Sequence, residues 1–153
     1  MNILKAEFND LEEILKLQYL AYISEAELLD DFNIGPLHQK LEEVQEEYKN
    51  GIILKAINSN NKIICSIRGF IKDNTLYIRK LIVNPSFENK GIGSSLLNEI
   101  EKYGNFSRAE LFTSSKSPKN LYFYNKNGYN SFKEEFISEQ SSKAKFVYFE
   151  KKF

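Results

Sequence analysis

Apolar positions in the first fifty residues repeat first at strand spacing and then at helical spacing. Residues Ile3–Phe8 alternate and predict a strand, and the Asn9-Asp10 pair supplies a helix N-cap. The helix that follows is expected to end at about Tyr22, because the acidic segment Ser24–Gly35 has no regular period. Pro36 suits the first turn of a second helix. The apolar face of that helix consists of Leu37, Leu41, Val44 and Tyr48.

After Gly51 the pattern becomes that of β-strands. Strands are predicted at Ile52–Ile57, Lys62–Lys72 and Thr75–Val83, with turns rich in Asn and Asp between them. Simple alternation places Tyr77, Leu81 and Val83 on one face of the third strand and Ile78 and Ile82 on the other. Apolar residues on both faces indicate a central strand that is covered on both sides.

Helices and strands alternate again in the last third of the chain. A helix begins at about Gly91, a strand spans Ala109–Thr113, and a short helix spans roughly Lys119–Lys126. Tyr129–Glu135 and Lys145–Lys152 then form an antiparallel pair. The element order βααβββαβαββ predicts an α/β (α+β) fold with one mixed, mostly antiparallel sheet of about seven strands flanked by helices. The 153 residues are expected to form a single domain, 1–153.

The composition excludes several classes of protein. With 42% hydrophobic and 14% aromatic residues, the chain is too apolar to be disordered. Cys65 is the only cysteine, so an intrachain disulfide and a cysteine metal cluster are excluded, and its apolar neighbours indicate a buried residue. No metal site is expected. Neither a signal peptide nor an apolar run long enough to span a membrane is visible, so we expect a cytoplasmic protein without a membrane partner.

The formal net charge is zero, but the two parts of the chain differ in sign. Residues 1–50 contain 12 Asp and Glu against 4 Lys, whereas residues 51–153 contain 17 Lys and Arg against 9 Asp and Glu. Acidic surface helices alone would explain this split. Alternatively, the acidic part attracts a cationic substrate and the basic part holds a polyanionic cofactor. The basic residues are scattered, which argues against a nucleic-acid partner.

The segment Leu81–Leu97 carries the first candidate chemistry. A buried strand and a loop lead to Gly91 and Gly93, which open an amphipathic helix. Glycine lets the backbone approach a ligand, and the first helical turn offers unpaired N–H groups and the positive end of a dipole, which suits a phosphate. A dinucleotide fingerprint is excluded by Leu96, and a Walker A loop is excluded because Lys90 precedes the glycines. Taken alone, the glycines are equally compatible with a tight strand-to-helix connection.

A second candidate lies in the segment Asn120–Tyr129. Asn120 and Tyr124 are four residues apart and share a helix face, so an amide and a phenol can point into one cleft. Taken alone, Tyr124 is better explained as a core residue whose hydroxyl lies at the rim.

Together these two segments resemble the GCN5-related N-acetyltransferase (GNAT) family. The pyrophosphate loop of the family, Gln/Arg-x-x-Gly-x-Gly/Ala, is matched by residues 88–93, with Glu88 in place of the usual Gln or Arg. The short helix that follows in the family begins with Asn and carries a Tyr before a Gly-(Phe/Tyr) pair, and Asn120 to Tyr129 match it. The resemblance covers roughly Lys62 to Tyr129, and the strand order extends it to the whole chain.

The resemblance implies an acetyl-CoA-dependent N-acetyltransferase in which an amine attacks the thioester directly. Tyr124 would be the catalytic acid that protonates the departing thiolate. The pantetheine arm would lie along the strand before the loop, and the pyrophosphate would lie on backbone N–H groups at the helix start. The implied cofactor-binding residues are Leu81, Ile82, Val83, Glu88, Asn89, Lys90, Gly91, Ile92, Gly93, Ser94, Asn120 and Lys126.

The acceptor pocket of the family is implied in residues 19–40, where Tyr22, Glu25 and Asp30 are the candidate substrate residues. An acidic rim there would favour a small cationic amine or a basic peptide end as acceptor. His38, the only histidine, is expected to be solvated rather than catalytic.

The general base is not assigned by the resemblance. The strand Tyr77–Leu81, where many relatives carry a Glu, has no carboxylate. A carboxylate from the early helices, such as Glu25 or Glu27, or a water chain must therefore accept the proton.

Other interpretations stay open. The chain could be a non-catalytic acyl-CoA-binding or regulatory module, or an enzyme that transfers another acyl group or acts on a protein N-terminus. The sequence also leaves open whether the protein forms a homodimer.

Overall fold

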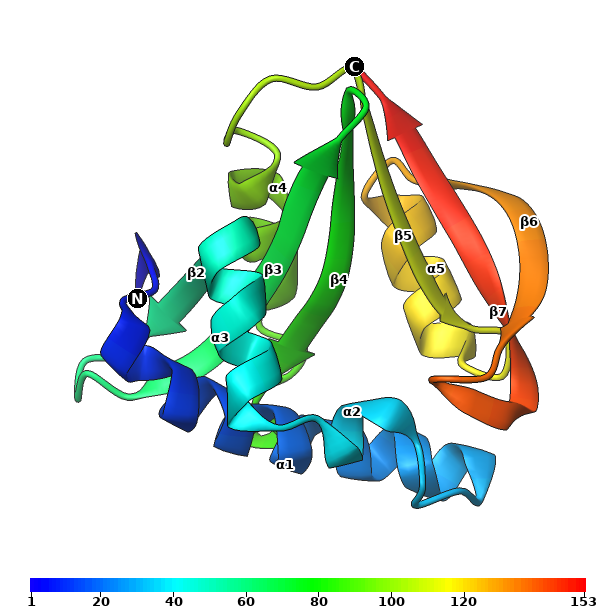
Figure 1. The fold of residues 1–153 in the computed structure, drawn as a ribbon, viewed down its shortest axis with the longest axis horizontal. Coiled ribbons are helices and arrows are strands. Elements are labelled where there is room, and N and C mark those ends of the chain that lie inside the picture. The colour runs from blue at the N-terminus through cyan, green and yellow to red at the C-terminus, as the bar shows by residue number, and fades with distance from the viewer.

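The computed structural model describes residues 1–153 and contains the predicted order of elements, with one additional short α-helix and two single-turn 3-10 helices, Phe8–Asp10 and Pro85–Phe87 (Figure 1). The strands are β1 (Asn2–Lys5), β2 (Ile52–Ile57), β3 (Ile63–Lys72), β4 (Thr75–Val83), β5 (Arg108–Ser114), β6 (Asn130–Ile137) and β7 (Ser141–Lys152). The α-helices are α1 (Leu11–Leu29), α2 (Gly35–His38), α3 (Leu41–Asn50), α4 (Ile92–Ile100) and α5 (Pro118–Lys126). The predicted fold class is confirmed.

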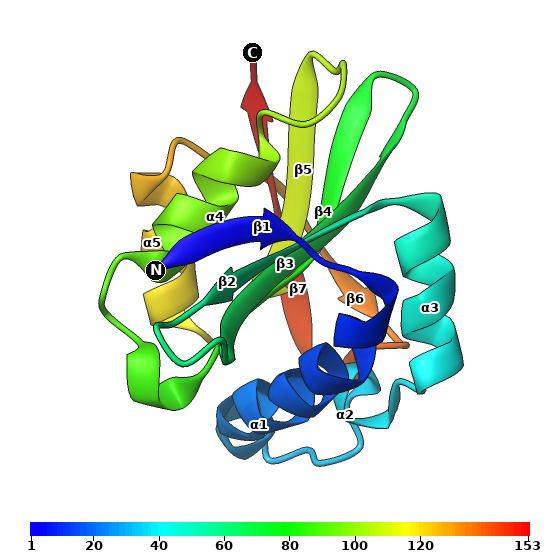
Figure 2. The same cartoon turned by 90° about the vertical axis from the view of Figure 1, so that its left-hand side faces the viewer.

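All seven strands form one open sheet in the order β1-β2-β3-β4-β5-β7-β6. Every neighbouring pair is antiparallel except β4 and β5, which are parallel. Helices α4 and α5 lie on one side of the sheet, and α1, α2 and α3 lie on the other (Figure 2). The sheet is therefore covered on both faces, as the apolar pattern of its central strands requires.

The apolar residues on the two faces form separate clusters. Leu96, Leu97 and Ile100 of α4 are fully buried against the middle strands. On the opposite face, Leu11 and Ile14 of α1 pack with other buried residues against the sheet. Cys65 belongs to the α4 cluster and is completely buried, which confirms that it is a core residue, and burial raises the pKa of its thiol to about 12.

A β-bulge in β4 changes which side chains share a face. Arg68 of β3 lies opposite Lys80, whereas the next residue, Gly69, lies opposite Ile78, so Arg79 is an extra residue without a partner in the register. As a result Ile78 packs into the α4 cluster and Ile82 into the α1 cluster. The prediction that Ile78 and Ile82 share a face is therefore wrong, because simple alternation does not anticipate a bulge.

Strands β4 and β5 pair only at their beginnings. The parallel register comprises Thr75 with Arg108, Leu76 with Ala109, and Tyr77 with Glu110, and it stops there. Beyond this point the two strands diverge, as Figure 1 shows for the gap between β4 and β5. The edge of β4 that faces β5 consequently has no strand partner from Ile78 to Val83.

Helix α1 is longer than the sequence pattern predicted. It continues through the acidic segment to Leu29 and ends at Asp30, which adopts a left-handed conformation with φ 49°. Ala26 and Leu29 are buried and pack with Ile34 and with Ala144 of β7, and this contact fixes the last turns of the helix. The expectation that residues 24–35 are irregular is therefore wrong for their first half, because the partner that buries this face lies more than a hundred residues away in sequence.

The predicted second helix is divided into two. Helix α2 is a single turn, Gln39 is extended, and α3 starts afresh at Leu41. The carboxylate of Glu43 accepts a hydrogen bond from the backbone N–H of Lys40 at 2.8 Å, which caps the start of α3. None of the helices combines the length and apolar character needed to cross a membrane.

Candidate active site

The loop between β4 and α4 leaves several backbone N–H groups without partners. Gly91 adopts a left-handed conformation with φ 78°, and no side chain caps the helix that follows. Ser95 donates to the Gly91 carbonyl at 3.1 Å, the bond that closes the first turn. The N–H groups of Ile92, Gly93 and Ser94 therefore have no carbonyl within the helix to bind, so this helix start can accept an anion.

Gly93 lies where α4, α5 and β4 meet. A Cβ atom at this position would be 3.3 Å from Cζ of Phe123 and 3.8 Å from Cγ2 of Val83. The absence of a side chain thus lets α5 pack closely beside the helix start, and it keeps the N–H groups accessible.

Charged side chains surround this helix start. Glu88, which stands where the family usually has Gln or Arg, forms an ion pair with Lys119 of α5 at 2.9 Å. Lys90 and Lys126 are exposed, and the ammonium group of Lys90 lies 5.7 Å from the centre of the Phe87 ring. The negative charge of Glu88 is therefore compensated by a neighbouring lysine.

Helix α5 directs Asn120 and Tyr124 toward the diverging strands. The Asn120 side-chain amide donates to the Thr113 hydroxyl of β5 at 3.1 Å. The Tyr124 ring lies 5.8 Å from that of Phe149 and 6.3 Å from that of Tyr129, so its orientation is fixed by aromatic packing.

Tyr124 meets residues of the opposite helix layer in a cavity of about 50 Å³. Tyr22 and Glu25 of α1 line this cavity from the other side of the sheet, so the opening between β4 and β5 connects the two layers. The complete lining consists of Tyr22, Glu25, Arg79, Leu81, Phe112, Thr113, Tyr124, Gln140 and Phe146. The structure thus brings together Tyr124, Leu81, Tyr22 and Glu25, four of the residues predicted from the sequence.

The cavity shifts the ionisation of the groups that line it. Burial raises the pKa of the Glu25 carboxyl from 4.5 to about 7. Burial, together with the neighbouring Glu25, raises the pKa of the Tyr124 phenol above its ordinary value, and the same causes act on Tyr22. A carboxyl group with a pKa near 7 can accept and release protons at neutral pH.

The remaining acidic residues of this region lie elsewhere. Asp30 is exposed at the end of α1, does not line the cavity, and receives a hydrogen bond on its backbone carbonyl from Lys143 at 3.2 Å. The neighbouring Asp31 carboxylate accepts a hydrogen bond from Ser141. Glu27 is also exposed. The structure therefore separates Asp30 from Tyr22 and Glu25, with which the sequence grouped it.

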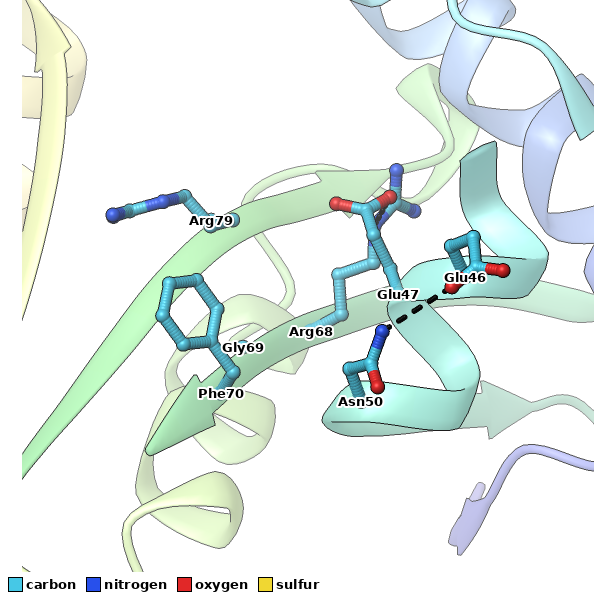
Figure 3. Close-up of a pocket in the computed structure, with 7 residues that line it drawn as sticks. All are labelled: Glu46, Glu47, Asn50, Arg68, Gly69, Phe70 and Arg79. Carbon is cyan, nitrogen blue, oxygen red and sulfur yellow. Dashed lines mark hydrogen bonds and ion pairs between the residues drawn. The ribbon is translucent and has the colours of Figure 1, made fainter. Parts of the chain in front are cut away.

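A larger cavity, of about 410 Å³, lies beside α3 (Figure 3). It is lined by Glu46, Glu47, Asn50, Arg68, Gly69, Phe70 and Arg79. Arg79 is the one residue that lines both cavities. Arg79 was not predicted from the sequence, because the local spacing of residues does not indicate the bulge that turns the Arg79 side chain toward the opening.

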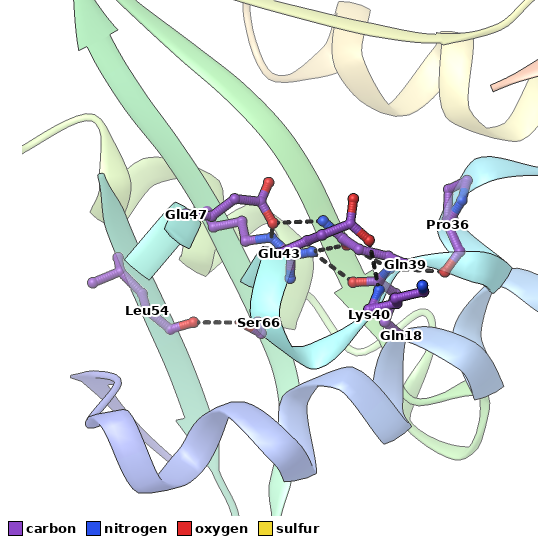
Figure 4. A network of polar contacts seen from close by, with 9 residues as sticks. Gln18, Pro36, Gln39, Lys40, Glu43, Glu47, Leu54 and Ser66 are labelled. Atoms are coloured by element: carbon purple, nitrogen blue, oxygen red, sulfur yellow. Dashed lines mark hydrogen bonds and ion pairs between the residues drawn. The ribbon is translucent and has the colours of Figure 1, made fainter. Parts of the chain in front are cut away.

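Arg68 and Glu47, which line this larger cavity, belong to a polar network that Figure 4 shows. Arg68 donates to the side-chain oxygens of Gln18 at 2.6 Å and Gln39 at 2.7 Å, and it lies 3.2 Å from the Glu47 carboxylate. Gln39 in turn donates to Glu47 at 2.8 Å. This network joins α1, α3 and β3. His38 lies outside it, exposed, with a hydrogen bond to the carbonyl of Phe32.

The sequence matches the model of the acetyltransferase (GNAT) family over residues 9–129. No curated protein matches it significantly. Similar solved structures include the PaiA N-acetyltransferase from Thermoplasma acidophilum in complex with coenzyme A, at 19% identity and a TM-score of 0.72, covering 99% of this chain and 98% of that one.

Two further structures are similar over nearly the whole chain. The ribosomal-protein-S18-alanine N-acetyltransferase from Escherichia coli has 12% identity and a TM-score of 0.78, covering 99% of this chain and 92% of that one. A chimera of spermidine N-acetyltransferase SpeG from Vibrio cholerae with hSSAT has 17% identity and a TM-score of 0.74, covering 99% and 94%. At these identities the similarities establish the fold. Since the family match spans most of the sequence, the chain belongs to the GNAT family of acetyltransferases.

Proposed function

We propose that the protein transfers an acetyl group from acetyl-CoA to a primary amine by direct attack of the amine on the thioester. The observation that carries this proposal is the opening between β4 and β5, where Tyr124 and Glu25 from opposite layers line one cavity. Family membership supports the reaction class, and the coenzyme A complex of PaiA supports the co-substrate. The similar structures named for spermidine and for a ribosomal-protein alanine support an amine acceptor.

The residues around α4 fit acetyl-CoA, which supplies the activated acetyl group when bound. The backbone of Glu88–Ser94, including the unpaired N–H groups at the helix start, would hold the pyrophosphate. The unpaired edge of β4 at Leu81–Val83 would hold the pantetheine arm by backbone hydrogen bonds. Asn120 would contact this arm, and Lys90 and Lys126 would offer positive charge to the phosphates.

Glu25 and Tyr124 would move the protons of the reaction. The amine nitrogen forms a bond to the acetyl carbon while the bond from that carbon to sulfur breaks. An acceptor that arrives as an ammonium ion first loses one proton to water. Glu25 accepts the second proton as the neutral amine attacks, and Tyr124 gives its hydroxyl proton to the departing sulfur. Water then carries the proton from Glu25 back to Tyr124, so the products are an amide and coenzyme A with a free thiol.

The electrostatics of the cavity are compatible with these two roles. Because burial raises its pKa, Tyr124 is protonated when the substrates bind; the same shift makes it a weaker acid, so the negative charge that develops on sulfur must drive the transfer of its proton. Glu25 is the only carboxylate among the residues that line the small cavity. The negative charge of Glu25 favours an acceptor whose amine arrives as an ammonium ion, in line with the cationic amine predicted from the sequence, whereas Arg79 adds a positive charge to the lining of the same cavity.

Release of the coenzyme A thiol on mixing with acetyl-CoA and an amine tests the proposal. The amines should include polyamines, amino acids, aminoglycosides and peptides, and mass spectrometry should detect the acetylated product. We expect turnover with at least one of these classes. Stabilisation of the protein by acetyl-CoA without turnover of any amine would contradict the proposal and would favour a non-catalytic acyl-CoA-binding module.

A further inference from the structure

Arg79 is a partly buried cation that the rest of the chain leaves without a partner. None of its guanidinium nitrogens takes part in a hydrogen bond or an ion pair within the chain, and its Nη1 atom is buried without any partner. The guanidinium lies 5.2 Å from the ring centre of Phe70, 5.1 Å from that of Tyr77 and 5.6 Å from that of Phe112. These rings hold the planar group in place but satisfy none of its hydrogen-bond donors.

Arg68, on the neighbouring strand, differs from Arg79 in having a carboxylate and two amide oxygens close to its guanidinium, although its Nε atom, like Nη1 of Arg79, is buried without a hydrogen bond. Two glutamine side chains accept its hydrogen bonds, and the Glu47 carboxylate lies 3.2 Å away. Figure 3 shows the Arg79 side chain extending away from Arg68 and Glu47, toward β5. Since a buried charge without a partner destabilises a fold, the lack of any partner for Arg79 points to a group supplied from outside the chain.

The carboxylates near Arg79 are already engaged with other cations. Glu47 faces Arg68, and Glu46 lies 3.9 Å from Lys49. Glu110 of β5 is bound by Arg108 at 2.8 Å. Lys80, next to Arg79, likewise forms no ion pair with a carboxylate, and burial lowers its pKa to about 8. The region around Arg79 therefore has an excess of positive charge.

Arg79 also lies at the place where an acceptor would extend away from the reacting amine. It lines the small cavity with Glu25 and Tyr124, and it lines the cavity of about 410 Å³ beside α3. The larger cavity has the size of a site for a small ligand. An acceptor with its amine at Glu25 and Tyr124 would therefore pass the guanidinium and continue into the larger cavity.

We propose that Arg79 binds a carboxylate of the acceptor, so that the substrate is an amine that also carries a carboxylate, as an amino acid does. The planar guanidinium fork matches a carboxylate in a bidentate geometry, and one uncompensated positive charge matches one negative charge. This inference rests on the proposed acetyltransferase function. It keeps the cationic amine end and adds an anionic group at the other end, which a polyamine lacks.

Matched acceptor pairs test the assignment. Each pair contains one amine in two forms, a free carboxylate and the corresponding carboxamide, so that only the charge differs. For the wild-type protein, kcat/KM is expected to be at least about tenfold higher for the carboxylate form, which corresponds to about 1.4 kcal/mol. Arg79→Gln should reduce this preference to about one while leaving KM for acetyl-CoA unchanged, and Arg79→Lys should retain part of it because it keeps the charge but loses the fork.

Lys16→Gln is the matched control for charge. Lys16 is an exposed residue of α1, its ammonium group lies 3.8 Å from the Glu12 carboxylate, and it lines neither cavity. It should therefore leave the ratio of carboxylate to carboxamide activity as in the wild type. Thermal unfolding checks each variant, and Arg79→Gln should unfold at a temperature no lower than the wild type, because the residue it replaces is an unpartnered charge.

The outcome separates this inference from the proposed function. A wild type that prefers carboxamides or polyamines, or an Arg79→Gln variant that keeps the preference for carboxylates, would overturn the carboxylate site while the acetyltransferase function stands. If no amine is acetylated, the proposed function fails. Calorimetry of amino acids with the protein–coenzyme A mixture then tests directly whether Arg79 binds a carboxylate. Binding that Arg79→Gln abolishes would support it, and no binding to the wild type would refute it.

Discussion

The two sides of the opening between β4 and β5 are built in different ways. On the α4 side, the groups that fit acetyl-CoA are mostly backbone N–H groups and a strand edge, supplied by two short segments of the chain. On the α1 side, the cavity is lined by side chains from α1, β4, β5 and the β6–β7 region. Backbone recognition needs only a local conformation, whereas the side-chain arrangement depends on the packing of distant elements. The cofactor side should therefore respond to changes of shape, and the acceptor side to changes of charge.

The largest effect is expected at Gly93. In Gly93→Asp a side chain would meet Phe123, only 3.3 Å from the new Cβ, and a negative charge would stand beside the pyrophosphate. Binding of acetyl-CoA should be lost. For the wild type, ligand at 100 times its Kd should raise the free energy of unfolding by about 2.7 kcal/mol, and the variant should show no such shift in thermal unfolding.

Asn98→Asp is the control for this change. Asn98 is an exposed residue of the same helix, so the variant adds the same charge without entering the helix start. It should retain nearly all of the stabilisation by acetyl-CoA. An equal loss in both variants would mean that net charge on α4, rather than the close approach at Gly93, governs cofactor binding.

Removal of the Tyr124 hydroxyl should have the next largest effect. Tyr124→Phe keeps the ring packing against Phe149 and removes only the acidic proton. We expect kcat to fall about 10²-fold with little change in acetyl-CoA binding, measured where chemistry limits the rate. Tyr122→Phe, on the exposed side of the same helix, should leave kcat unchanged. An unchanged kcat in Tyr124→Phe would mean that another group protonates the sulfur.

Glu25 should control the pH dependence of the reaction. Its pKa of about 7 predicts that kcat/KM rises as the pH increases through 7, because only the ionised carboxylate accepts the amine proton. Glu25→Gln should lower kcat/KM by about 10- to 100-fold and remove this rise. Glu27→Gln, exposed on the same helix, should behave as the wild type. A wild-type rise near pH 7 that persists in Glu25→Gln would exclude Glu25 as the base.

The contribution of Glu25 to the stability of the fold should change with pH in the opposite direction to its contribution to activity: it should fall as the pH rises. The folded protein raises the Glu25 pKa from 4.5 to about 7, so folding favours the protonated form. This contribution to stability is fully present below about pH 4.5 and is lost as the pH rises through 7. Glu25→Gln should therefore unfold at a higher temperature than the wild type at pH 8, with a smaller difference at pH 4.

The difference between the two sides also explains what the sequence could predict. The order of strands and helices, the two glycines and the position of Tyr124 depend on local periods and turn residues, and the fold agrees with these predictions. The continuation of α1 to Leu29 depends on Ala144 at the other end of the chain. Arg79 turns toward the opening only because β4 contains a bulge. Neither the contact with Ala144 nor the bulge can be read from the local spacing of residues. Glu25 could be suggested as a candidate because the acidic segment is visible in the sequence, whereas nothing in the sequence singled out Arg79.

The smallest effect is expected at Glu88, where the chain departs from the family pattern. A carboxylate near a pyrophosphate is unfavourable, but Glu88 and Lys119 form an ion pair at 2.9 Å whose side chains are 37% and 63% exposed. Such exposed pairs contribute about 0–1 kcal/mol. Glu88→Gln removes the repulsion and frees Lys119 to face the phosphates, so the Kd for acetyl-CoA should fall about two- to threefold at low salt.

Lys119→Ala should have the opposite effect, because it leaves the Glu88 carboxylate uncompensated beside the cofactor. In the double variant the two changes should largely cancel. Glu134→Gln, which removes an exposed carboxylate of strand β6 outside the loop between β4 and α4, is the control for net charge and should leave the Kd unchanged. All differences should shrink in 1 M salt, where screening acts over about 3 Å. Weaker binding in Glu88→Gln would mean that Glu88 holds the loop in its binding conformation, so that even at this position shape would outweigh charge on the cofactor side.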